Sequence, residues 1–251
     1  EVNTGFTNSY IYSLSINPVN SDIVYAGSYG NGLFKSVDGG KNWISKNNRL
    51  FNLFIRNISC DPVNLEIIYL GTDGGGVFKS TDGGENWIQK NNGLKNRYVY
   101  WIEIDPKNSN IIYAGTYGGG IFKSIDGGEN WIQKNNGLSK LKIWCLAINP
   151  VNTNIVYAGT WEGGIFKSTD GGENWKEINN GLSKLEVLSL LIDKFNPNTI
   201  YAGTWEGGIF KSIDGGENWK EINNGLGSKY TYSLKMVPNN SNIIYAGGIG
   251  G

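Results

Sequence analysis

The sequence predicts an all-β protein, a β-propeller of four-stranded antiparallel blades, from three observations. First, an octad with the pattern Ser-x-Asp-Gly-Gly-x-Asn-Trp occurs five times, and its aspartates always lie 44 residues apart. Second, the residues between octads divide into four short segments with the alternating or wholly apolar pattern of β-strands. Third, four strands in about 40 to 50 residues is the size of a propeller blade. Residues 1–251 are therefore interpreted as one propeller domain.

Each repeat contains four predicted strands, and each strand has a recurring residue pattern. The first is typified by residues 143–148 (IWCLAI), and its counterparts begin near Ile11, Ile55, Val99, Val187 and Thr231. The second carries a tyrosine at a fixed position, at Tyr25, Tyr69, Tyr113, Tyr157, Tyr201 and Tyr245. The third carries a phenylalanine before Lys-Ser, at Phe34, Phe78, Phe122, Phe166 and Phe210. The octad follows, and the fourth strand is expected to start at its tryptophan.

The strand count predicts the number of blades. The first and second strands occur six times, whereas the third and fourth occur five times. Residues 1–6 (EVNTGF) align with residues 221–226 (EINNGL), which end a fourth strand, and residues 232–251 supply a first and a second strand. We therefore expect six blades, with the sixth closed by strands from both ends of the chain. Five blades with a spare hairpin are the alternative.

Each octad is expected to form a tight turn between the third and fourth strands. Aspartate accepts hydrogen bonds from the backbone N–H groups that follow it, the glycine pair adopts left-handed conformations, and the tryptophan has a large area to bury. These residues are interpreted as structural: Asp38, Asp82, Asp126, Asp170 and Asp214, with Trp43, Trp87, Trp131, Trp175 and Trp219.

The octad resembles the Asp-box, also called the BNR repeat, and the chain resembles the Asp-box β-propellers. That group includes sialidases, xyloglucan-active hydrolases, the sortilin ectodomain and photosystem II assembly factors. Five octads in register carry the resemblance over essentially the whole chain. It implies a fold more firmly than an activity, because one fold hosts unrelated functions. It also implies that the octads lie away from the catalytic face of such proteins.

The loops between the second and third strands carry the candidate ligand-binding residues. At one loop position four of the six repeats have an aromatic residue, and a glutamate follows each tryptophan. An aromatic ring beside carboxylates suits a sugar, a peptide or a cationic group. The candidates are Tyr29, Asp73, Tyr117, Trp161, Glu162, Trp205 and Glu206, with Ile249 at the sixth position. As ligand platforms the tryptophans should be largely exposed; the alternative is that they pack against neighbouring blades.

Composition excludes several classes of function. Lysine and arginine number 22, as do aspartate and glutamate, so no net charge draws the chain to nucleic acid or to an anionic membrane. No apolar run approaches the ~20 residues that span a bilayer. The chain has no histidine, and its two cysteines lie at unrelated repeat positions, which predicts neither a metal site nor a disulfide. No cofactor is expected.

Catalysis is not predicted, and glycoside hydrolysis is the one enzyme class worth weighing. The resemblance to sialidases would require an arginine cluster and an Arg-Ile-Pro motif, but the arginines are only Arg49, Arg56 and Arg97, and that motif is absent. A glycosidase would have to use Glu162 with Glu206, or Asp73 with Glu103. Repeated positions have similar surroundings, whereas an acid and a base need different ones.

The expected function is therefore a non-catalytic scaffold that binds a protein partner or an assembly. One alternative is a carbohydrate-binding or glycoside-hydrolysing propeller. Another is a structural subunit of a filament or surface layer, in which the incomplete last blade offers an edge to another chain. The sequence starts at Glu1 without an initiator methionine or a leader, which favours removal of a targeting segment and an extracytoplasmic or secreted location.

Overall fold

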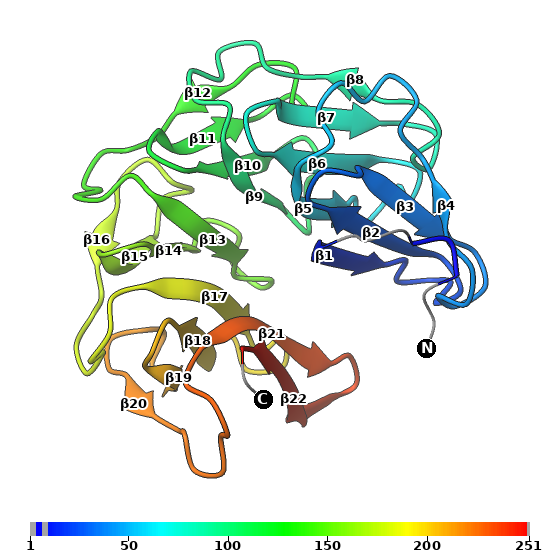
Figure 1. Cartoon of the computed structure of the whole chain (residues 1–251). Helices are drawn as coiled ribbons and strands as arrows, with labels where there is room; N and C mark the ends of the chain where they lie inside the picture. Colours follow the sequence, from blue (N-terminus) through cyan, green and yellow to red (C-terminus); the bar gives the residue numbers. More distant parts are fainter. Residues whose placement is uncertain (1–3, 7–9, 250–251) are drawn as a thin grey trace. The chain divides into compact units, whose positions relative to one another are not determined.

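The computed structural model describes residues 4–6 and 10–249, which form six antiparallel sheets in chain order (Figure 1). Over these ranges the chain has no helix, and so none that is long and apolar enough to cross a membrane. Two compact units are present, residues 1–116 with 122–133 and residues 117–121 with 134–251. The prediction of one domain over residues 1–251 stays a prediction.

The first unit holds the first two sheets and most of the third. The first sheet consists of β1 (Ile11–Ile16), β2 (Val24–Ser28), β3 (Leu33–Ser36) and β4 (Ile44–Ser45). The second consists of β5 (Ile55–Cys60), β6 (Ile68–Thr72), β7 (Gly76–Ser80) and β8 (Ile88–Gln89). The third consists of β9 (Val99–Ile104), β10 (Ile112–Thr116), β11 (Gly120–Ser124) and β12 (Ile132–Gln133).

The second unit holds the remaining sheets. The fourth consists of β13 (Ile143–Ile148), β14 (Val156–Thr160), β15 (Gly164–Ser168) and β16 (Lys176–Glu177). The fifth consists of β17 (Val187–Ile192), β18 (Ile200–Thr204), β19 (Gly208–Ser212) and β20 (Lys220–Glu221). The sixth is a hairpin of β21 (Thr231–Val237) and β22 (Asn240–Gly248). Every first strand begins where the sequence predicts, because apolar β-branched or aromatic residues recur there in each repeat.

The first strand of each sheet contains a β-bulge at its second residue. Ile143 pairs with Thr160 and Cys145 pairs with Gly159, so Trp144 is the extra residue on β13. A bulge redirects the side chain of the extra residue away from the regular alternation of the strand. The bulged residues all occupy one repeat position: Tyr12, Arg56, Tyr100, Trp144, Leu188 and Tyr232.

The octads form the predicted turns between the third and fourth strands. In the fourth sheet, Ser168 Oγ accepts the backbone N–H of Gly172 at 2.8 Å and donates to Asp170 Oδ1 at 2.8 Å. Asp170 Oδ1 also accepts the backbone N–H of Asn174 at 2.9 Å. Gly172 has φ of 88°, in the left-handed region that glycine adopts at little cost.

The fourth strands are shorter than expected. The prediction that each starts at the octad tryptophan is wrong by one residue, since β16 begins at Lys176 and β20 at Lys220. The physical reason is that the indole of Trp219 reaches back to the fourth sheet, where its Nε1 donates to the carbonyl of Ile178 at 2.8 Å. The tryptophan therefore ends the turn and joins two sheets.

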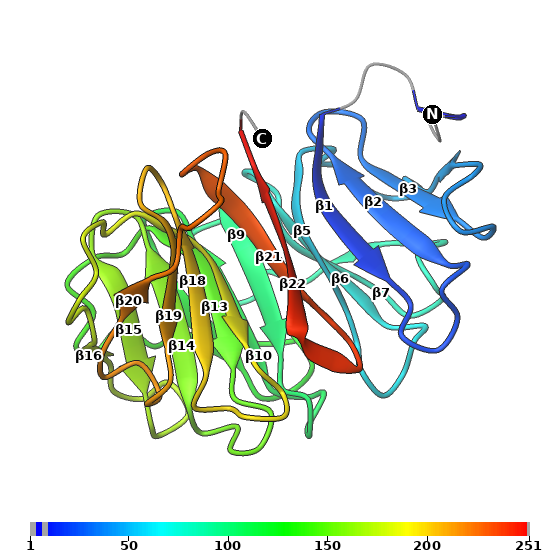
Figure 2. The same cartoon turned by 90° about the horizontal axis from the view of Figure 1, so that it is seen from below.

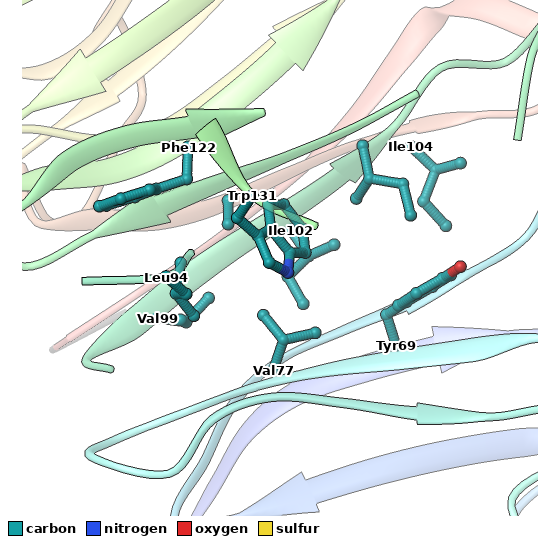
Figure 3. Close-up of a cluster of buried hydrophobic side chains, with 10 residues drawn as sticks. Tyr69, Val77, Leu94, Val99, Ile102, Ile104, Phe122 and Trp131 are labelled. Atoms are coloured by element: carbon teal, nitrogen blue, oxygen red, sulfur yellow. The ribbon is translucent and has the colours of Figure 1, made fainter. Parts of the chain in front are cut away.

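The octad tryptophan and the phenylalanine of the third strand fill the space between neighbouring sheets. Figure 3 shows Trp131 and Phe122 among buried side chains of the second and third sheets, including Tyr69, Val77 and Leu94. Trp131 is only 3% exposed. Burial of each such side chain contributes about 1.5 to 3 kcal/mol, so contacts between sheets hold the repeats together.

The β21–β22 hairpin occupies the place of a sixth blade. A Cβ atom added at Gly203 of β18 would lie 2.7 Å from Thr231 Cγ2, just as one at Gly159 of β14 would lie 2.8 Å from Val187 Cγ1. The hairpin thus packs on the fifth sheet as the fifth packs on the fourth (Figures 1 and 2). The prediction of six blades is confirmed, with two strands in the sixth.

The N-terminal alignment is supported where the structure describes it. The backbone N–H of Trp43 donates to the carbonyl of Thr4 at 3.0 Å, as that of Trp131 donates to the carbonyl of Asn92 at 2.9 Å. Thr4 therefore contacts the first octad in the same way that the residue after a fourth strand contacts the octad of the next repeat. The proposed closure of the sixth blade by residues 1–3 lies outside the described residues and stays a prediction.

Candidate functional site

The loops between second and third strands are tied to the linkers that precede the next first strand. In the second unit, the backbone N–H of Gly164 donates to the carbonyl of Leu185 at 2.8 Å. The N–H of Gly208 donates to the carbonyl of Lys229 at 2.9 Å. Loops and linkers therefore share one side of these sheets, which we call the loop rim.

Six aromatic rings form a continuous row on the loop rim of the second unit. Trp144 lies 6.3 Å from Tyr117 and 5.3 Å from Trp161, measured between ring centroids. Trp205 lies 5.8 Å from Trp161, 4.9 Å from Tyr230 and 5.8 Å from Tyr232. Most neighbours meet edge to face, a favoured geometry for aromatic pairs. We call these rings the aromatic row: Tyr117, Trp144, Trp161, Trp205, Tyr230 and Tyr232.

The aromatic row is partly covered. Trp161 and Trp205 are half-buried, because each ring packs against its neighbours in the row, while Tyr117 and Tyr232 are each 37% exposed. The exposed fractions of these four rings lie between those of a fully exposed aromatic side chain and those of a core side chain. The row thus keeps a preformed arrangement and leaves part of its apolar surface in water.

The two glutamates beside the tryptophans adopt a costly backbone conformation. Glu162 has φ of 76° and Glu206 has φ of 63°, whereas the other four repeats have glycine at this position in the sequence. A non-glycine residue in this region costs roughly 1 to 3 kcal/mol, and such strain gathers at functional positions. Glu162 pairs with Lys142 at 3.7 Å, and Glu206 pairs with Lys184 at 3.3 Å.

In the first unit, Tyr29 and Asp73 lie around Arg56. The guanidinium carbon is 4.9, 5.0 and 4.5 Å from the ring centroids of Tyr12, Tyr29 and Tyr100. Its Nε donates to Asp73 Oδ2 at 3.0 Å. Burial lowers the pKa of the Arg56 guanidinium, but the hydrogen bond and charge of Asp73 outweigh it and raise the pKa overall. Asp73 is therefore held in an ion pair.

The bulged residues are part of this arrangement, although they were not predicted from the sequence as site residues. Arg56 and Trp144 link loop residues that would otherwise lie apart, and both occupy the bulged position of a first strand. A signal was present, since the same repeat position carries Tyr12, Tyr100 and Tyr232. The last loop candidate, Ile249, follows β22 and is exposed.

The octad carboxylates are engaged within their own turns. Hydrogen bonds from the side chain and backbone of Asn174, and from Ser168, hold the pKa of Asp170 at about 2. The preceding sheet also binds the octad backbone, since Tyr157 Oη and Lys167 Nζ donate to the Gly215 carbonyl at 3.1 and 2.9 Å.

The remaining chemical candidates also have partners. Glu103 Oε2 accepts the indole N–H of Trp101 at 2.9 Å. Cys60 and Cys145 are free thiols, and burial raises the pKa of the Cys60 thiol, which makes it a poor nucleophile. In residues 4–6 and 10–249, no three acidic or cysteine side chains gather as a metal site would require.

Solved structures with the same fold include enzymes and binding proteins. No protein-family model and no curated protein matches the sequence. An ancestral GH74 enzyme is 21% identical, with a TM-score of 0.84 over 100% of this chain and 36% of that one. YCF48 bound to D1 peptide is 18% identical, with a TM-score of 0.68 over 91% and 71%. An extracellular domain from B. thetaiotaomicron is 18% identical, with a TM-score of 0.75 over 99% and 33%.

These structural similarities show the fold alone. This chain spans about a third of the length of the GH74 enzyme and of the B. thetaiotaomicron protein that it resembles. At sequence identities near 20%, the activity or partner of one propeller cannot be assigned to another. Together with the six sheets in sequence, they establish that the chain has the fold of a β-propeller.

Proposed function

We propose that this chain is a non-catalytic binding module whose aromatic row docks a protein partner. The observation that carries the proposal is the row itself, six rings held together on one rim and only partly covered. Tryptophan and tyrosine supply most of the binding energy at protein interfaces, because they bury a large area at little cost in conformational entropy.

The chemistry around the row favours binding over hydrolysis. Glu162 and Glu206 are paired with lysines, and Tyr230 Oη donates to Glu206 at 3.3 Å. A glycosidase needs one carboxyl held protonated and another held ionised at a shared sugar. Paired carboxylates at the edge of apolar rings instead resemble the polar rim of a protein interface.

The edge-to-face packing favours a polypeptide ligand over a sugar. A sugar ring stacks on one open aromatic face, whereas rings that meet edge to face cover part of one another's faces. The propeller fold is known to serve such a purpose in YCF48 bound to D1 peptide.

A carbohydrate ligand is the second candidate. Trp161 and Trp205 each stand beside a glutamate, which is a common setting for sugar recognition, and GH74 enzymes share the fold. This candidate requires that the face of at least one tryptophan be reachable by a ring-sized ligand.

The octads are Asp-boxes in this proposal, and the chain is an Asp-box propeller. The support is the recurrence of the Ser-Asp-Gly hydrogen bonds in all five turns. Their aspartates and tryptophans then have a structural role. An extracytoplasmic location fits the extracellular domains among the similar structures.

The test is a variant with Trp161→Ala and Trp205→Ala, compared with the unchanged chain on a peptide display library and on a glycan array. We expect peptide ligands rich in aliphatic and aromatic residues, and their loss in the variant. Stability should fall by about 1 to 2 kcal/mol per ring, since the rings are half-buried, compared with roughly 3 to 5 kcal/mol for a core tryptophan.

The matched control is Ile213→Ala, which removes an exposed apolar side chain from an octad turn. It should leave binding and stability unchanged. Glycan ligands without peptide ligands would establish the second candidate. Unchanged peptide binding by the double variant would move the site away from the aromatic row.

A further inference from the structure

A pocket of about 320 Å³ lies where the octad of the fifth sheet meets the outer strands of the fourth sheet. The outermost of these strands is β16, the edge strand of its sheet (Figure 1). The pocket lies within the second unit and shares no residue with the aromatic row. Its volume is near the lower end of the ~300 to 1,000 Å³ range of small-molecule sites, so it fits a small ligand. Its lining includes Lys167, Asp170, Trp175, Lys176, Ile178 and Glu217.

Elsewhere in the chain, a lysine joins one repeat to the octad glutamate of the next repeat. This lysine stands three residues after the octad tryptophan, and its Nζ lies 2.6 Å from the glutamate: Lys46 with Glu85, Lys90 with Glu129 and Lys134 with Glu173. Glu85 is also 3.8 Å from Lys35 of β3. The octad glutamate position can therefore receive two ammonium groups.

The interface that holds the pocket has isoleucine at this lysine position. Ile178 is 6% exposed and lines the pocket. Among the described residues Glu217 has one ion-pair partner, Lys167 of β15, at 3.4 Å. The Nζ of Lys167 also donates to the carbonyl of Gly215 at 2.9 Å. Because a carboxylate has about four lone-pair sites, Glu217 can still accept from a second ammonium group.

The fourth sheet carries a lysine at another place, directly opposite Lys167. Lys167 pairs with Lys176 across β15 and β16, whereas the equivalent lysine of each of the first three sheets pairs with an isoleucine. Like charges directly opposite each other on neighbouring strands are destabilising. The ammonium of Lys176 has no hydrogen-bond or ion-pair partner in the part of the chain that the structure describes. An anionic group bound at Lys176 would offset this repulsion.

The charges of the pocket favour a ligand that carries both signs. The lining holds two cations and two carboxylates: Lys167, Lys176, Asp170 and Glu217. Asp170 is engaged within its own turn, where it accepts from Ser168 at 2.8 Å. A simple anion would meet these carboxylates and a simple cation would meet the lysines, whereas a zwitterion can place each charge beside an opposite one.

We infer that this pocket binds a free α-amino acid. The ammonium group of the ligand donates to Glu217, as a lysine does in the other interfaces. The carboxylate of the ligand accepts from Lys176, and an apolar side chain lies against Ile178. This site is separate from the aromatic row and does not depend on the function proposed for it.

The experiment is isothermal titration calorimetry of the 251-residue chain with L-leucine and with glycine. Both should bind saturably, with one ligand per chain. N-Acetyl-L-leucine lacks the ammonium group and L-leucine amide lacks the carboxylate. Each should bind at least about tenfold more weakly than L-leucine, because one charged hydrogen-bonding group is lost.

Paired variants of the chain locate the site. Glu217→Gln and Lys176→Ile should each weaken L-leucine binding by at least about tenfold. Glu173→Gln and Lys220→Ile change the same repeat positions outside the pocket and should bind as the unchanged chain does. Trp161→Ala should also bind normally, which separates this site from the aromatic row.

A further variant fills the site from within. Ile178→Lys introduces the lysine that three other interfaces have at this position. Its ammonium should pair with Glu217 and prevent L-leucine binding, while circular dichroism shows an unchanged fold. Normal L-leucine binding by this variant would overturn the inference.

Other results would overturn it as well. One is the absence of saturable binding of both L-leucine and glycine. Another is equal affinity for L-leucine and its acetylated or amidated derivative, which would mean that the charged groups are not recognised. A third is unchanged binding by Glu217→Gln and Lys176→Ile, which would place the ligand elsewhere on the chain.

Discussion

Ser168 and Asp170 act in the same octad turn but differ in burial. The hydroxyl of Ser168 is buried and accepts the N–H of Gly172, whereas Asp170 is exposed and accepts the N–H of Asn174 near water. Ser168→Ala leaves a buried donor unpaired and should cost about 1 to 3 kcal/mol, while Asp170→Ala should cost about 1 kcal/mol or less. Urea unfolding midpoints of the two variants test this order. A larger loss for Asp170→Ala would show that its carboxylate does more than accept these bonds.

The octad turn as an element should make the fold sensitive to acid. Hydrogen bonds from the octad asparagine and serine hold the pKa of all five octad aspartates at about 2, below the ordinary value near 3.9: Asp38, Asp82, Asp126, Asp170 and Asp214. Because the folded pKa is lowered, the stability that they contribute is present above about pH 4 and is lost as the pH falls toward 2.

We therefore expect the urea midpoint to change little between pH 7 and 5 and to fall steadily from pH 4 to 2. Asp170→Asn should reduce the proton uptake in that window by about one fifth, since one of five equivalent groups no longer titrates. Added salt should leave the window in place, because hydrogen bonds rather than distant charges lower the pKa. A midpoint that is constant down to pH 2 would contradict this account.

At the scale of the whole molecule, stability should follow the contacts between successive repeats. Stacked repeats gain most of their stability from neighbours, so a sheet that has a partner on each strand edge opens less often. Within the second unit, amides of β18 should therefore exchange slowly and those of β22 should exchange fastest among the strands. Hydrogen exchange with mass spectrometry checks this order. Equal protection of β22 and β18 would mean that the edge of the sixth sheet is already covered.

Much of the fold could be predicted because the repeat makes each position visible several times. The starts of the first strands, the octad turns and the six-sheet count follow from local pattern, since apolar alternation and Asp-Gly-Gly turns act over a few residues. The candidate site was predicted only in part. Trp161 and Trp205 were found from loop composition, but Trp144 was read as an ordinary strand residue.

The sequence by itself determined the repeat, its strands and its turns, because these depend on contacts between residues close in the chain. Only the tertiary structure decided which side chains meet across repeats. The bulge at Arg56 turns its guanidinium among three tyrosines and toward Asp73, and the bulge at Trp144 brings its ring to Trp161. Such contacts depend on how neighbouring sheets pack and on where a strand departs from regular alternation, and neither is encoded in a local pattern.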